Sequence, residues 1–180
     1  MDRAKLKELF EEFRRVSREF DKRVRRVVDE NFERVRDELF KESCKPEDYP
    51  AVKEHFSRYL SKEKLLDEVL TCITDVLWML ATNGCTPSPD FDFRLSPEFK
   101  GVDPEELIIV ETYCELMTSK LLELVAKELG IRVEVGVCIR VSEEDRKKLA
   151  RIAGYDKLDR LLKSLFDQTN SQLRAKSPEQ

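Results

Sequence analysis

The sequence predicts a mainly α-helical fold: a helical bundle with a long N-terminal helix, followed by a C-terminal strand-helix-helix module. Charged and hydrophobic residues make up 39% and 41% of the 180 residues, and only five are glycine, a composition typical of helix-rich proteins with few loops. Apolar residues recur at helical spacing through most of the chain. Only residues 131–141 alternate strictly, with a β-branched residue at every second position, as a half-buried strand does.

Residues 2–42 contain neither glycine nor proline, and we expect them to form one helix. Their apolar stripe repeats every eleven residues at Phe13, Val24 and Val35, which favours a nearly straight helix over a left-handed coil. Such a helix would be about 60 Å long. A compact domain of this size does not need that length, so part of the helix is expected to project or to pair with another subunit.

The same helix carries a run of seven basic side chains between Arg14 and Arg26. The run could bind phosphate groups. Alternatively, it is a solvated face whose cations pair with acids one turn away, such as Glu11 with Arg15 and Glu19 with Arg23. The second interpretation is favoured.

The middle of the chain predicts a turn at 43–50, helices at 51–60 and 61–82, an irregular segment at 84–102 and a helix at 103–129. Asp103 and Pro104 are a strong helix start, and Gly130 is a stop. Alternation at Phe91–Leu95 makes that segment a candidate short strand. Together with the N-terminal helix, these elements predict a bundle over residues 1–130.

The strand at 131–141 is followed by a helix capped by Ser142, a break at Gly154 and a last amphipathic helix that reaches residue 168. We expect 131–168 to be a separate module and 169–180 to be a disordered polar tail. A lone strand leaves backbone groups unpaired. It must therefore pair either with its copy in a second subunit or with Phe91–Leu95.

Several functional classes lack their motifs. The chain has no HExxH, GxSxG, GxGxxG or phosphate-loop pattern, and its five cysteines are never closer than 13 residues apart. The single histidine, His55, belongs to no paired carboxylate motif. Glu111 and Glu115, with Asp75, could in principle bind a metal, but solvated acids are the favoured interpretation. We therefore expect no enzyme activity and no cofactor.

Charge and hydropathy suggest where the protein works. The net charge of −4 divides into an acidic middle (residues 43–130, with 17 acidic and 9 basic groups) and two mildly basic ends, which permits nucleic-acid contact at the ends. A charged N-terminus and the lack of a long apolar run predict a cytoplasmic protein without a membrane span. Dense charge with few loops is also a tendency of thermophilic proteins.

The segment from about residue 132 to 166 resembles the ribbon-helix-helix family of dimeric DNA-binding proteins, the MetJ/Arc class. The resemblance is carried by Ile139-Arg140-Val141, by the capping Ser142-Glu143-Glu144-Asp145, and by Leu149, Ile152 and Ala153. In that family the strand pairs with its copy in a second subunit, and the ribbon enters the major groove. The resemblance implies that double-stranded DNA contacts Arg132, Gly136, Cys138 and Arg140, with a phosphate near Lys157.

The sequence therefore predicts a homodimeric, transcription regulator-like protein that binds DNA through a β-ribbon. The alternative is a non-enzymatic helical interaction or scaffold subunit of a larger assembly. In that alternative the strand pairs within the chain, and the helix at 2–42 contacts a protein partner.

Overall fold

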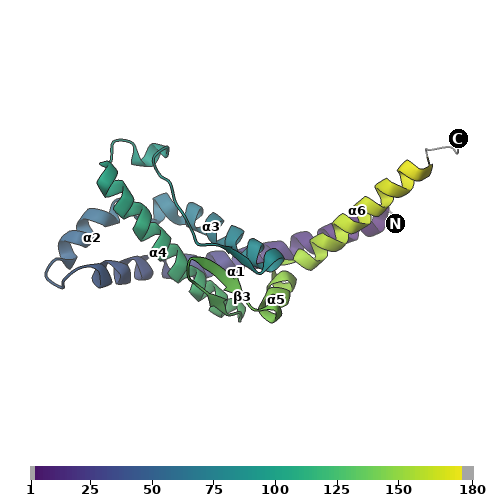
Figure 1. The fold of residues 1–180 in the computed structure, drawn as a ribbon, viewed down its shortest axis with the longest axis horizontal. Helices are drawn as coiled ribbons and strands as arrows, with labels where there is room; N and C mark the ends of the chain where they lie inside the picture. The colour runs from purple at the N-terminus through teal and green to yellow at the C-terminus, as the bar shows by residue number, and fades with distance from the viewer. Residues whose placement is uncertain (1–2, 176–180) are drawn as a thin grey trace.

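The computed structural model describes residues 3–175, with the side chains of residues 4–166. The protein is mainly helical, as predicted (Figure 1). In the described residues a small antiparallel sheet accompanies the helices. The elements are α1 (Arg3–Ser43), α2 (Tyr49–Ser57), α3 (Lys62–Asn83), β1 (Cys85–Pro87), the 3-10 turn η1 (Pro97–Phe99), α4 (Pro104–Leu129), β2 (Val133–Glu134), β3 (Cys138–Val141), α5 (Glu143–Ala153) and α6 (Tyr155–Ala175).

Helix α1 is the long N-terminal helix that the sequence predicted, and it runs the length of the molecule (Figure 1). Its middle packs against α3 and α4, where Val28 and Phe32 are completely buried. Burial begins at Phe20, and no described side chain of α1 before it is buried. The helix therefore extends well beyond the core that holds it.

The helix boundaries follow from capping residues that were readable in the sequence. The Asp103 carboxylate accepts a hydrogen bond from the Glu105 backbone N–H (2.9 Å), and Pro104 occupies the first turn of α4. Gly130 ends that helix in the left-handed conformation, at φ 67°. The Ser142 hydroxyl accepts from the Asp145 N–H at the start of α5. These predicted ends are confirmed.

The prediction of one continuous strand at 131–141 is wrong. The chain turns back between β2 and β3, which pair antiparallel with Val133 opposite Val141. On its other side β3 pairs with β1, with Cys85 opposite Arg140, so the strand order is β1-β3-β2. A hairpin satisfies within the chain the backbone groups that a lone strand would leave open.

The candidate strand at Phe91–Leu95 is also wrong, because the intramolecular partner of β3 is β1. Residues 91–95 form no strand. The Phe93 backbone N–H instead donates to the Glu111 carboxylate (2.7 Å), and the Phe93 ring is buried. The Glu111 carboxylate of α4 thus accepts the backbone hydrogen bond that the carbonyl of a neighbouring strand would otherwise accept.

One hydrophobic core crosses the predicted boundary between residues 130 and 131. Ile131, Ile139 and Leu149 belong to the same buried cluster as Phe32 of α1 and Ile73 of α3. Helix α5 packs on α3, and α6 packs on α1. Helix α6 also continues to Ala175, past the predicted start of the tail at residue 169, and residues 176–180 lie outside the described part.

The first part of α1 and α6 lie side by side and project from the body (Figure 1). We call residues 3–19 together with α6 the arm. Trp78 of α3 packs at its root, with ring centroids 6.5 Å from Phe13 and 6.2 Å from Tyr155. The Lys157 ammonium pairs with the Glu12 carboxylate across the arm, 2.6 Å apart. The arm is therefore anchored at one end only.

Gly154 lets α6 leave α5 close against α1. It has φ +86°, and a Cβ there would lie 3.2 Å from Val16 Cγ1 and 3.5 Å from the Phe13 ring. Gly101 has the same φ but no heavy atom within 4 Å. Both Gly→Ala changes place a side chain in the left-handed region, at a cost of about 1–2 kcal/mol.

We predict that Gly154→Ala lowers the free energy of unfolding by about 1–3 kcal/mol more than Gly101→Ala, because only the former crowds α1. Urea unfolding of the two variants measures the difference. Equal losses would show that α6 does not pack against α1 as described.

Candidate interaction site

Two predicted DNA-contacting residues, Cys138 and Arg140, share the outward face of the sheet. Between them Ile139 is fully buried on the opposite face. The Arg140 Nε–H donates to the Cys138 sulfur at 3.1 Å. Arg140 is flanked across the strands by Glu134 and Cys85. This face therefore combines one arginine with an acid and two thiols rather than forming a basic surface.

The other predicted contacts are dispersed. Arg132 is exposed just before β2, and Gly136 lies in the turn of the hairpin, where its carbonyl accepts from the Ser88 hydroxyl. Lys157 sits at the root of the arm, paired with Glu12. Both edges of β3 are paired within the chain, so β3 has no free edge for a second subunit. DNA binding stays a prediction.

The arm exposes apolar side chains that the rest of the described chain does not cover. Phe10 is 45% exposed, Leu162 43% and Phe166 67%, and Leu165 is also exposed. Among the described side chains of α6, only Leu161 is buried. A short pair of helices gains little stability from propensity alone and needs a packed apolar face. The arm therefore looks incomplete without a covering surface.

The total surface area supports the same point. The chain exposes 11719 Å², whereas a compact monomer of 21.2 kDa exposes roughly 9,100 Å². The excess of roughly 2,600 Å² for one chain is more than the roughly 800 Å² that each partner loses in a standard protein–protein interface. The chain is extended enough for a second chain to cover a large part of it.

The run of basic residues on α1 divides into two parts. Towards the body, Arg25 pairs with Asp67 (3.1 Å) and Arg26 with Glu128 (2.6 Å). Towards the arm, Arg15 and Arg18 form no ion pair with any described residue. The predicted pairs Glu11–Arg15 and Glu19–Arg23 are not formed, and Arg23 instead donates to the Glu128 backbone carbonyl. On the arm, Arg18 thus forms no ion pair with a described residue, and Arg15 has a nearby acid, Glu12, that is already paired with Lys157.

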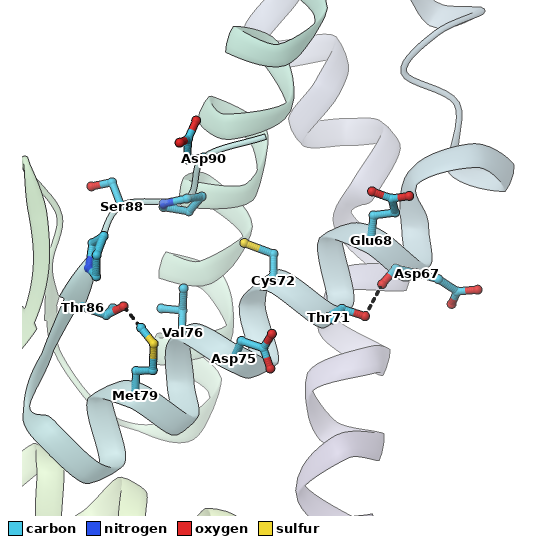
Figure 2. Close-up of a pocket in the computed structure, with 12 residues that line it drawn as sticks. Asp67, Glu68, Thr71, Cys72, Asp75, Val76, Met79, Thr86, Ser88 and Asp90 are labelled. Carbon is cyan, nitrogen blue, oxygen red and sulfur yellow. Dashed lines mark hydrogen bonds between the residues drawn. The ribbon is translucent and has the colours of Figure 1, made fainter. Parts of the chain in front are cut away.

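An acidic groove of about 620 Å³ runs along the outer side of α3, beside residues 86–90 (Figure 2). Its rim carries four carboxylates and no basic residue, and its floor is largely apolar. Burial, followed by the nearby Asp75 carboxylate, raises the pKa of the Cys72 thiol to about 11. The rim comprises Asp67, Glu68, Asp75 and Asp90, and the floor includes Val76, Met79, Pro87 and Pro89.

Sequence reasoning did not predict this groove. Thr71 and Asp75 were readable as the polar side of a helix, because they lie one turn apart opposite its apolar stripe. Asp90 comes from the irregular segment after β1, and no local spacing relates it to Asp75. Only the path of the chain after β1 brings them to one groove.

The lone histidine has an acidic partner that the sequence did not reveal. Nε2 of His55 in α2 contacts the Glu106 carboxylate of α4, and the Tyr59 hydroxyl donates to the same carboxylate at 3.2 Å. Glu106 was readable only as an acid in the first turn of a helix. The pair joins α2 to α4.

The chain matches no family model, no curated protein and no solved structure. None of the helices in residues 3–175 is long and apolar enough to cross a bilayer. Within the same described part, no three His, Cys, Asp or Glu side chains are grouped so that they could hold a metal ion.

The raised pKa of Cys72 has a measurable consequence. Iodoacetamide reacts with the thiolate, so we predict that alkylation of Cys72 is slow at pH 8 and rises about tenfold per pH unit up to pH 10. Peptide mapping by mass spectrometry separates it from the exposed Cys85, which we expect to react faster at pH 8. A rate for Cys72 that levels off below pH 9 would contradict the buried position.

Proposed function

We propose that the protein is a non-enzymatic helical interaction subunit that self-associates through its arm. The observation that carries the proposal is the apolar surface of Phe10, Leu162 and Phe166 on two helices anchored only at their root. Exposed apolar patches on a monomer mark interaction sites, and four large exposed apolar side chains of the described chain lie on the arm: Phe10, Leu162, Leu165 and Phe166. The proposal corresponds to the scaffold alternative, with the strand paired inside the chain.

The partner that we propose is a second copy of this chain. Most soluble oligomers consist of identical subunits, and the surface excess leaves room for a contact of standard size with a second copy. The arm also carries charges of both signs, with ten basic and seven acidic residues in 3–19 and 155–175. Such a surface does not repel a copy as strongly as a surface of one sign would.

The arm's apolar residues alone are not enough for a stable complex. Complete burial of such a side chain contributes about 1.5–3 kcal/mol, and these residues are already about half buried. Four of them therefore contribute roughly 3–6 kcal/mol, while association costs about 4–15 kcal/mol in lost freedom. The surface that receives the arm must supply further favourable contacts.

We predict that the wild-type protein forms oligomers whose mass rises with concentration, and that Phe10→Glu/Phe166→Glu weakens association by at least about tenfold. The cause is that two charges replace apolar groups that the complex would bury. Light scattering over a range of concentrations measures the effect.

The matched control is Val137→Glu, which places a charge on a fully exposed valine of the hairpin, outside the arm. It should leave the mass unchanged. A wild-type monomer at every concentration would overturn the proposal. So would an arm variant that associates like the control.

A further inference from the structure

We infer that the arm of one copy docks in the acidic groove of the next, so that the subunits join head to tail. The inference rests on the proposed self-association and adds the surface that receives the arm. It assigns a role to the groove along α3, which the fold alone does not explain.

The charges of the groove and the arm are complementary. The groove presents four carboxylates and no basic residue in its lining. Arg25, which lines the adjoining hollow, is already paired with Asp67. The arm presents Arg18, which forms no ion pair with a described residue, and Arg15, whose acidic neighbour Glu12 is already paired with Lys157. Opposite charges that lack partners within one copy can find them in the next.

The apolar surfaces correspond as well. On the arm, Arg14 lies over the Phe10 ring, 5.6 Å from its centroid, so a cation and an aromatic group are presented together. In the groove the carboxylates surround an apolar floor that includes Met79, which is exposed. If a helix of the arm lies in the groove, its aromatic side chains can contact the apolar floor and its basic side chains can contact the acidic rim.

The groove also opens sideways, towards α1. A second hollow of about 550 Å³ lies beside the same stretch of α3, shares Asp67, Thr71 and Asp75 with the groove and reaches Asp21 of α1. Together they form one broad, open depression. Such a depression suits an arriving helix better than a small ligand, which is usually enclosed on most sides.

The arm cannot reach the groove of its own copy. Residues 3–19 continue in a single helix into residues 21–25, which border the groove, and the arm points away from the body (Figure 1). The contact is therefore between copies, and it joins two different surfaces. A repeated contact of this kind closes into a ring or continues as a chain.

Two complementary variants test the inference. Phe10→Glu/Phe166→Glu disables the arm and leaves the groove intact, whereas Glu68→Lys/Asp75→Lys reverses the groove and leaves the arm intact. Glu68 and Asp75 are exposed and form no ion pair with a described residue, so the fold should tolerate the change. Glu123→Lys/Glu144→Lys makes the same change in charge at exposed acids outside the groove.

We predict that each disabled variant alone is monomeric and that a 1:1 mixture forms a complex of two chains, because one intact arm then meets one intact groove. The charge control should associate like the wild type. Light scattering and circular dichroism on all four proteins give the masses and verify the fold.

The outcomes separate the two proposals. If the groove variant associates like the wild type, or if the mixture stays monomeric, head-to-tail docking is overturned while arm-mediated association stands. If the arm variant associates like the wild type, both proposals fall.

Cys72 supplies a second measurement that does not depend on the groove variant. It lines the groove, so docking should slow its alkylation at pH 9 by about tenfold or more in concentrated wild-type protein, relative to the arm variant. The exposed Cys85 serves as the internal control. Equal rates for Cys72 in the two proteins would overturn the docking site.

Discussion

The packing of the middle of α1 against α3 and α4 is the interaction on which the rest of the structure depends. Val28 and Phe32 are fully buried there, and Arg36, also buried, donates to the Leu60 carbonyl at 3.2 Å and to the adjacent Asp37 carboxylate. A buried guanidinium needs such partners. Because this contact holds only the later part of α1, the apolar stripe that continues towards the N-terminus is covered by α6 and, at the root of the arm, by Trp78 of α3. The arm exists because the apolar stripe of α1 extends further towards the N-terminus than the core that buries its later part.

The small sheet differs from the arm, because the backbone groups of β3 form their hydrogen bonds with β1 and β2 of the same chain. Pairing β3 on both edges fixes the hairpin to the end of α3 through Gly84, whose carbonyl accepts from the Val141 N–H at 3.0 Å. The edge of β3 that an intersubunit ribbon would use is therefore occupied, and the outer edges of the sheet are the short strands β1 and β2. On the arm, by contrast, the groups left exposed are apolar side chains and not unpaired backbone groups. An interaction subunit that uses helices is therefore easier to reconcile with the fold than one that uses a strand.

The helices were predictable because their signals are local. The α1 stripe, the Asp103-Pro104 start and the Gly130 stop each depend on neighbouring residues, and all are found in the structure. The hairpin was missed because the alternation continues through its turn. Val135 and Val137 keep the pattern although Val137 is fully exposed. Strand β1 was missed because Cys85–Pro87 is too short to show a period and contains a proline.

The candidate site was predictable only in part, for a related reason. The excess length of the N-terminal helix already suggested a contact surface, whereas the groove combines α3 with a segment that follows β1. The central claim, that the arm is covered by another copy, is tested most directly by hydrogen–deuterium exchange of the α6 backbone amides at low and high protein concentration. The account predicts that protection over residues 155–175 rises with concentration. Fast exchange that stays the same at every concentration would contradict it.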